Sequence, residues 1–254
     1  MEKIKYYDAI FKRKSIRKFD LAPLDSKDFS DLVEFIKDVK PMFSEIKIET
    51  RIVGHKEIKN IVPIVAPHYL LLFSKSTGAY LTNAGFMLQQ VDLYLSANGI
   101  GCCYLGLANP SKEIKADFEC EGFEYVIMLG FGKPKEPVHR ANTNEFKRRS
   151  LADIFEGEIS NQLMEVARLS PSASNRQPWF FTGTNEVIHA YCSKQNIIKA
   201  LLYERMNKID MGIALCHIDI AAEHEGLKIS FTLDEDAKTK APKGHYYIAT
   251  ALIQ

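Results

Sequence analysis

The stretch NAGFMLQQVDLYLSANG at residues 83–99 decides the fold. Its apolar residues Ala84, Leu88, Val91 and Leu95 recur at helical spacing and form one stripe along a helix. The stretch ends in an Asn-Gly pair, a common signal for a helix C-terminus. We therefore expect a long helix here, more apolar than the amphipathic helix that residues 25–40 predict.

The same pattern returns without a gap 127 positions further along the chain, at residues 210–226. Positions 85, 92 and 99 carry Gly, Asp and Gly in both copies. Short apolar runs, which predict buried strands, flank each copy at residues 70–74 and 125–129 and at residues 188–193 and 246–250. Agreement of glycines, aspartate and flanking strands indicates a tandem duplication.

Each half is predicted to contain a helix, two strands, a long helix and a further strand, in that order. We expect an α+β fold of two half-repeats, each with a small, mainly antiparallel sheet flanked by helices. The long helices would pack at the centre, so that the chain forms a pseudo-dimer. The predicted halves are residues 1–155 and 156–254, and no Gly, Pro or Ser-rich linker separates them.

Composition narrows the class of function. Lys and Arg total 33 against 32 Asp and Glu, so no basic excess favours nucleic acid or a membrane surface. The N-terminus mixes acidic and basic residues, unlike a secretory signal, and the most apolar stretch, residues 61–73, is too short to span a bilayer. A cytoplasmic protein with a small-molecule partner is the expectation.

Cysteine and histidine spacing gives no sign of a metal site. The five cysteines contain no C-x-x-C pair, and we expect reduced thiols, with Cys120, Cys192 and Cys216 filling the core. His217 and His224 lie seven positions apart, which is not a zinc-binding spacing.

Three segments can carry chemistry. Residues 11–19, FKRKSIRKF, cluster cations and a hydroxyl that suit a phosphate, although a solvated basic turn would look the same. Residues 170–181, SPSASNRQPWFF, form a proline-flanked polar loop that suits a planar heterocycle, or simply a helix stop before a strand whose Trp179 fills the core. Residues 99–106, GIGCCYLG, form a glycine-rich loop that lets backbone approach a flat ring.

Together these segments resemble the nitroreductase family. Residues 13–19 resemble its R-x-S-x-R-x-F element, residues 170–179 its S-P-S-x-x-N-x-Q-P-W loop, and residues 99–106 its G-L-G-x-x-W-x-G loop, with Tyr104 where tryptophan is commoner. Residues 130–134, GFGKP, resemble its G-Y-P strand end, and residues 147–150 fall where the family often places basic residues near the flavin phosphate.

The resemblance implies a nitroreductase-like fold, non-covalently bound FMN, and hydride transfer from NAD(P)H to an acceptor such as a nitroaromatic or a quinone. It assigns no catalytic side chain. The residues it implies for cofactor binding are Arg13, Lys14, Ser15, Arg17, Gly101, Cys103, Tyr104, Leu105, Gly106, Arg148, Arg149, Pro171, Ser172, Ala173, Ser174, Asn175 and Gln177.

The chain departs from the family's pattern in one respect, which bears on the number of flavin sites. Ordinary members are homodimers with flavin sites at the subunit interface, whereas here the basic element is clear only in the first half and the Ser-Pro loop only in the second. This resembles a fused, divergent subgroup, and we expect one composite flavin site per chain, in a monomer or a homodimer. A specialised flavoenzyme of the same fold and a non-catalytic flavin-binding protein remain alternatives.

Overall fold

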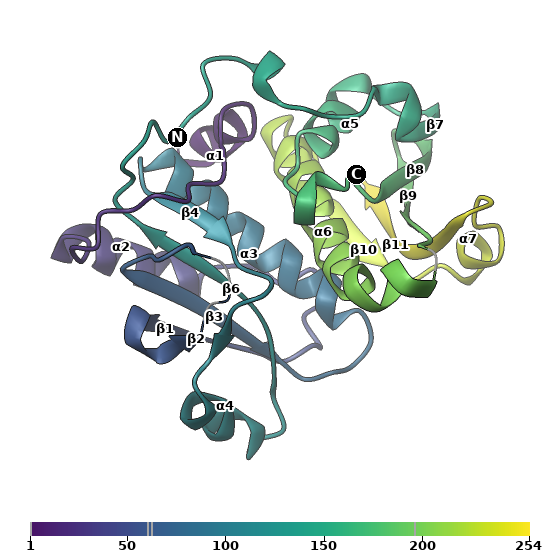
Figure 1. Cartoon of the computed structure of the whole chain (residues 1–254). Coiled ribbons are helices and arrows are strands. Elements are labelled where there is room, and N and C mark those ends of the chain that lie inside the picture. Colours follow the sequence, from purple (N-terminus) through teal and green to yellow (C-terminus); the bar gives the residue numbers. More distant parts are fainter. Residues whose placement is uncertain (1, 60, 62, 196) are drawn as a thin grey trace.

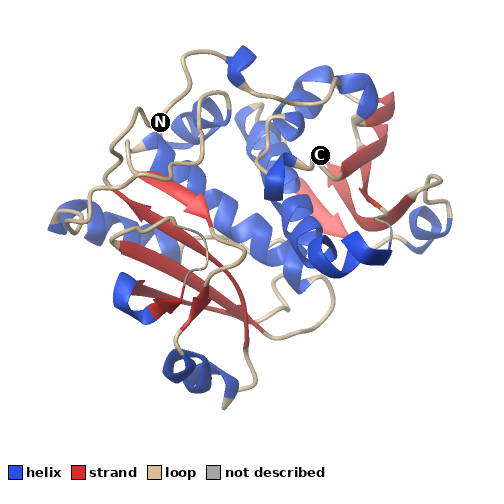
Figure 2. Cartoon of the chain, viewed as in Figure 1, coloured by secondary structure: helices blue, strands red, loops and turns tan. Residues whose placement is uncertain are grey.

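The computed structural model describes the chain except for residues 1, 60, 62 and 196. Two β-sheets lie on opposite sides of a central pair of long helices, α3 (Tyr80–Ala97) and α6 (Ile197–His224), which pack against each other (Figure 1). The shorter helices lie around the two sheets and the central pair (Figure 2). No described helix is long and apolar enough to cross a membrane.

The first sheet is antiparallel, with strand order β1-β3-β6-β4. Its strands are β1 (Ile48–Gly54), β3 (His68–Ser74), β4 (Gly101–Tyr104) and β6 (Glu124–Gly132). The accompanying helices are α1 (Glu2–Ile10), α2 (Ser26–Lys37) and α4 (Lys112–Glu119). A two-stranded ribbon pairs β2 (Ile58–Lys59) with β5 (Asn109–Pro110).

The second sheet has the strand order β10-β11-β9-β8-β7. Its strands are β7 (Phe155–Glu158), β8 (Trp179–Thr184), β9 (Val187–Ser193), β10 (Ile229–Thr232) and β11 (His245–Ile253). Helices α5 (Asn161–Arg168) and α7 (Glu235–Thr239) accompany it. The pairing is antiparallel except between β7 and β8, which are parallel.

The two sheets repeat one topology, as the sequence repeat predicts. The order β8-β9-β11-β10 matches β1-β3-β6-β4 strand for strand, and α3 and α6 hold equivalent places in the two halves. Strand β7 is an addition at the edge of the second sheet, and it begins at Phe155. The division into residues 1–155 and 156–254, whose boundary falls within this strand, stays a prediction.

The repeated glycines lie where α3 and α6 approach each other. A Cβ on Gly85 would come within 2.0 Å of the Ile209 carbonyl oxygen, and a Cβ on Gly212 within 1.8 Å of the Thr82 carbonyl oxygen. Any side chain at either position would therefore push the helices apart. This close approach explains why both copies of the pattern keep glycine at that position.

Several local predictions need correction. Helix α2 begins after its N-cap Asp25, as predicted, but ends at Lys37 instead of residue 40. The backbone of Lys40, which precedes a proline, is held by the side-chain amide of Gln90. Helix α3 begins at Tyr80, three residues before the predicted start.

Two further predictions were wrong, one for a segment of the first sheet and one for a cysteine at the surface. The predicted loop at residues 99–106 contains β4, because Gly101 and Tyr104 pair with Gly132 and Leu129 of β6. Cys120 is exposed at the end of α4, where its thiol donates to the Asp117 carbonyl. By contrast, Cys192 and Cys216 are buried as predicted.

Candidate functional site

Two adjoining cavities form a cleft between the halves. Their volumes are about 350 Å³ and 470 Å³, within the range of small-molecule sites. Both are lined by Ser15 and Arg17 from the first half and by Pro171, Ser172 and Ser174 from the second. The basic element and the Ser-Pro loop, more than 150 residues apart in sequence, therefore meet at one site.

The smaller of these, which we call the apolar cavity, has walls from β4, β6 and α6. Its other lining residues are Cys103, Tyr104, Gly106, Leu107, Ile127, Ala173, Tyr203, Met206, Ile209, Asp210 and Ile213. Met206 of α6 reaches across to the first half, since a Cβ on Gly106 would lie 2.7 Å from the Met206 sulfur. Glycine at 106 thus leaves room for the wall that α6 contributes.

The larger, which we call the charged cavity, gathers cations from several segments. Its other lining residues are Arg13, Lys14, Glu136, Arg140, Glu145, Lys147, Arg148 and Asn175. Burial, followed by the nearby charge of Arg13, lowers the pKa of both Arg140 and Arg148 to about 10. Crowded, partly desolvated guanidinium groups are stabilised by an anion.

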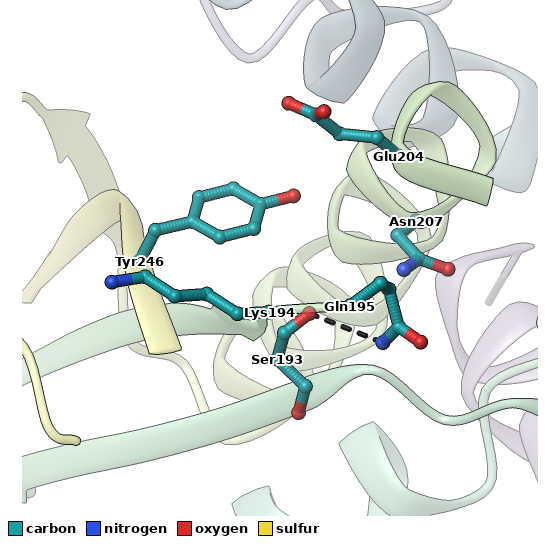
Figure 3. Close-up of a pocket in the computed structure, with 6 residues that line it drawn as sticks. All are labelled: Ser193, Lys194, Gln195, Glu204, Asn207 and Tyr246. Atoms are coloured by element: carbon teal, nitrogen blue, oxygen red, sulfur yellow. Dashed lines mark hydrogen bonds between the residues drawn. The ribbon is translucent and has the colours of Figure 1, made fainter. Parts of the chain in front are cut away.

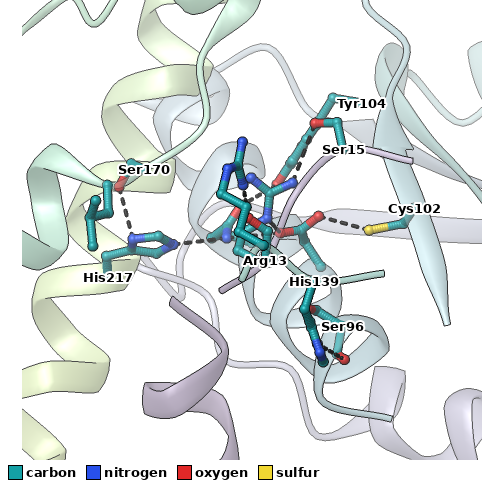
Figure 4. Close-up of polar contacts among 12 residues, drawn as sticks. Arg13, Ser15, Ser96, Cys102, Tyr104, His139, Ser170 and His217 are labelled. Atoms are coloured by element: carbon teal, nitrogen blue, oxygen red, sulfur yellow. Dashed lines mark hydrogen bonds and ion pairs between the residues drawn. The ribbon is translucent and has the colours of Figure 1, made fainter. Parts of the chain in front are cut away.

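Arg13 is more deeply buried than a simple phosphate clamp would be. Its Nε lies 2.8 Å from the Asp92 carboxylate, and the two side chains are 2% and 0% exposed. One terminal nitrogen of Arg13 also donates to Ser15 Oγ at 3.3 Å (Figure 4). Asp92 therefore neutralises this arginine, and the exposed Arg17 and the half-buried Arg148 are more available to a ligand.

The Ser-Pro loop is held in a strained shape. Ser174, Asn175 and Gln177 adopt positive φ angles of 52°, 55° and 52°, which side-chain-bearing residues rarely adopt. The Ala173 N–H donates to both carboxylate oxygens of Asp210 at 3.1 Å, and Arg148 donates to Asn175 Oδ1 at 2.6 Å. These bonds fix the loop before any ligand arrives.

A buried polar network lies behind the cleft (Figure 4). The hydroxyl of Tyr104 donates to Gln89 Oε1 at 3.1 Å, and Gln89 Nε2 donates to Asp92 at 3.1 Å. The same amide nitrogen lies 2.9 Å from His217 Nε2. Through Asp92 and Gln89 the network connects Arg13 of the charged cavity with Tyr104 of the apolar cavity.

The network assigns the tautomer of His217. Its Nδ1 lies 2.8 Å from the Val166 carbonyl, which only accepts, so Nδ1 carries the proton and Nε2 accepts from Gln89. Burial lowers the pKa of His217 to about 3, and the imidazole is therefore neutral. It contributes to packing and hydrogen bonding between the halves.

Four of the predicted site residues do not line the cleft. Gly101 packs against Ile16, and Leu105 lies in the core. The Arg149 guanidinium donates to the Asp153 carbonyl, while its backbone N–H donates to Gln177 Oε1 at 2.7 Å. Gln177 is 6% exposed and holds the Ser-Pro loop from the inside. The other predicted residues all line one or both cavities.

The sequence did not lead us to expect that α6 forms a wall of the apolar cavity. Tyr203, Met206, Ile209, Asp210 and Ile213 repeat every three or four positions along one face of the helix. That spacing was visible in the sequence, but an apolar helical stripe more often indicates core than a binding site. Arg140 belongs to no recognisable sequence motif. Its position depends on the backbone of Arg13, because its guanidinium donates a hydrogen bond to the Arg13 carbonyl.

The fold and the composite cleft define an α+β protein of nitroreductase-like fold with a tandem pair of halves. The chain belongs to the family described as "Putative TM nitroreductase", which it matches over residues 5–222. The resemblance seen in the sequence motifs is thereby confirmed.

The chain is similar to several solved structures. One from Thermotoga maritima MSB8, described as a "putative nitroreductase", aligns with a TM-score of 0.64 and 20% identity, covering 98% of this chain and 92% of that one. An FMN-dependent nitroreductase from Clostridium difficile R20291 aligns with a TM-score of 0.43 and 13% identity over 57% of this chain and 94% of its own. A nitroreductase family protein from Clostridium novyi NT aligns with a TM-score of 0.42 and 18% identity over 52% and 86%. No curated protein matches the sequence.

Proposed function

We propose that this protein is an FMN-dependent oxidoreductase that transfers hydride from NAD(P)H to a small organic acceptor such as a nitroaromatic or a quinone. The observation that supports the proposal best is the joining of an apolar and a cationic cavity at two nitroreductase-like motifs. FMN has the matching parts, a flat ring system at one end and a phosphate at the other.

The described residues fit this cofactor. Arg148 lines the charged cavity, and its buried Nε has no hydrogen-bond partner in the described part of the chain, so this arginine keeps one donor unused. Arg17, Arg140 and Arg148 would hold the phosphate, since charge-assisted bonds to phosphate are strong. The backbone and hydroxyls at residues 172–174, with Tyr104 and Gly106, would hold the ring.

Bound flavin would supply the redox chemistry, accepting hydride from the nicotinamide and passing electrons on. The chain's own part is to bind and orient. The strained Ser-Pro loop is fixed by Asp210 and Arg148, and the α6 wall of Tyr203, Met206 and Ile213 would shield one side of a bound flavin from water. Such preorganisation is what a hydride-transfer enzyme requires of its protein.

The fused chain has no intact second cleft in this proposal. A shift of 127 positions relates Tyr104 and Ile213, which line the apolar cavity, to Phe231 and Phe86. Those two rings pack edge to face with centroids 5.4 Å apart, and Met42 and Phe43 of the corresponding loop are buried in the same core cluster. Aromatic packing thus fills the space that a second flavin would need, and we propose one flavin per chain.

The visible spectrum of the purified protein and its change with NADH or NADPH test the proposal. The expected protein is yellow, or becomes so on incubation with FMN, and the flavin absorbance bleaches anaerobically when a dinucleotide is added. Steady-state oxidation of NADH and NADPH with several acceptors then separates an enzyme from a flavin-binding protein. A colourless protein that binds no FMN at micromolar concentration would refute the proposal.

A further inference from the structure

A third cavity lies beside the cleft but shares none of its lining residues. Its volume is about 240 Å³, and it lies between the end of β9, the start of β11 and α6 (Figure 3). The lining residues are Ser193, Lys194, Gln195, Glu204, Asn207 and Tyr246. We call it the Asn207 cavity.

Asn207 has unmet hydrogen-bonding capacity. The residue is 1% exposed, and neither its Nδ2 nor its Oδ1 has a hydrogen-bond partner among the described residues. Buried polar side chains are nearly always paired, so an unpaired amide on a cavity wall indicates a missing partner. An asparagine amide places a donor and an acceptor side by side, which is the pattern that adenine complements with N7 and its N6 amino group.

The Asn207 cavity and the apolar cavity are lined by neighbouring residues of α6. Tyr203 and Met206 face the apolar cavity, whereas Glu204 and Asn207, each the next residue along the helix, line the other. A molecule long enough to extend past this helix could therefore occupy both spaces.

Arg176 lies between the two cavities. Its guanidinium carbon is 4.2 Å from the centre of the Tyr203 ring, and a terminal nitrogen donates to Gln195 Oε1. Its Nε is buried and has no partner in the described part of the chain. A cation with an unused donor at this boundary suits a pyrophosphate that crosses from one cavity to the other.

We propose that the Asn207 cavity binds the adenine of the reducing dinucleotide while the nicotinamide reaches the apolar cavity. This inference rests on the proposed function, because it assigns the adenine end of the electron donor. Asn207 would recognise the base, Arg176 would contact the pyrophosphate, and the Tyr246 ring would offer an apolar surface next to the base.

Competition experiments on FMN-loaded protein test the site without altering it. AMP should raise the apparent KM for NADH and leave the maximal rate unchanged. Adenosine, which has no phosphate, should do the same at higher concentration, and this separates base recognition from anion binding in the charged cavity. Absence of competition by both compounds would overturn the inference.

An electron donor that lacks adenine, reduced nicotinamide mononucleotide, provides a sharper test. The Asn207→Leu variant should raise the KM for NADH at least tenfold and leave kcat and flavin content unchanged. Its activity with reduced nicotinamide mononucleotide should not change, because that donor lacks the base. The melting temperature without nucleotide should not fall, since an unpaired buried amide has been removed. Asn161→Leu, at an exposed position on α5, is the matched control.

The outcomes distinguish this inference from the proposed function. If Asn207→Leu changes the KM for both donors equally, or for neither, the adenine assignment is wrong while flavin reduction still supports the oxidoreductase. If neither donor reduces the bound flavin in the unmodified protein, the proposed function itself fails.

Discussion

Asn83 and Asp210 occupy equivalent positions on α3 and α6, and each holds the loop that leads into an equivalent strand, β1 in the first half and β8 in the second. Asn83 Oδ1 accepts from the N–H groups of Met42 and Phe43 at 2.7 Å and 3.0 Å, and Asp210 accepts from the Ala173 N–H. Equivalent contacts are thus made by an amide in the half whose loop is buried and by a carboxyl group in the half whose loop lines the cleft.

The first prediction concerns the pH dependence that the buried carboxyl group of Asp210 creates. Burial raises the pKa of Asp210 well above 3.8. The native state then holds a proton that the unfolded state has lost, so Asp210 lowers stability as the pH rises above about 4. Asp210→Asn keeps an accepting oxygen for Ala173 and should raise the denaturation midpoint at pH 7 but not at pH 3.

Asn83→Asp is the reciprocal variant and should do the opposite. It places an ionisable group at a fully buried site, which favours its protonated form, so the variant should lose stability between pH 4 and 7. Chemical denaturation across this range measures both variants. Equal midpoints for Asp210→Asn and the unmodified protein at neutral pH would contradict the assignment.

The second prediction concerns acid. The pKa of His217 is about 3 in the native state, below the 6.5 of an unperturbed imidazole. As the pH falls from 6.5 towards 3 the unfolded state takes up a proton that the native state does not, so stability is lost, by up to roughly 4 to 5 kcal/mol. His217→Gln should be less stable at pH 7, because bonds to Gln89 and Val166 weaken, but should lose less stability on acidification.

His224→Gln provides the control for that measurement. His224 lies exposed at the end of the same helix and stacks on Tyr7 with centroids 4.0 Å apart. Its replacement should leave the acid-induced loss of stability in place. A His217→Gln protein that keeps the same pH profile as the unmodified protein would show that another group causes the acid sensitivity.

The third prediction tests the phosphate. Arg17→Ala and Arg148→Ala should each remove charge-assisted bonds worth about 1.5 to 3 kcal/mol and weaken FMN binding by roughly ten to a hundredfold. Riboflavin has no phosphate, so its affinity should fall much less, and least in Arg17→Ala, because Arg148 also holds the Ser-Pro loop through Asn175. Fluorescence titrations with both flavins make the comparison, and Lys240→Ala, at an exposed position, is the control. Equal losses for both flavins would show that these cations do not contact a phosphate.

A fourth prediction distinguishes Arg13 from those two arginines. Its removal leaves the Asp92 carboxylate, which is 0% exposed, without its ion-pair partner. Breaking a buried pair in this way is expected to destabilise the fold by about 3 to 5 kcal/mol. Arg13→Ala should therefore lower the denaturation midpoint strongly, whereas Arg17→Ala should not. A variant with normal stability and selectively weak FMN binding would instead make Arg13 a direct ligand of the phosphate.

The sequence predicted the parts of the fold that short-range patterns determine. Gly85 and Gly212 could be matched because close helix packing tolerates no side chain at either position, and Trp179 is buried as one reading of its loop required. The ion pair of Arg13 with Asp92 could not be foreseen, because it joins residues that only the tertiary fold brings together. Likewise, the lining role of Met206 depends on how α6 crosses the first half.

The last prediction is the flavin content. A faithful fusion of two ordinary halves would bind two flavins, but the counterparts of Tyr104 and Ile213 are Phe231 and Phe86, in ring contact at 5.4 Å. Phe43, in the loop equivalent to the Ser-Pro loop, is also buried, so a second flavin would have to displace a packed core. Released flavin measured against protein concentration should therefore approach one per chain, and Arg148→Ala should lower the whole of it. A ratio near two, or a half of the flavin that resists this substitution, would mean that the aromatic cluster opens to form a second site.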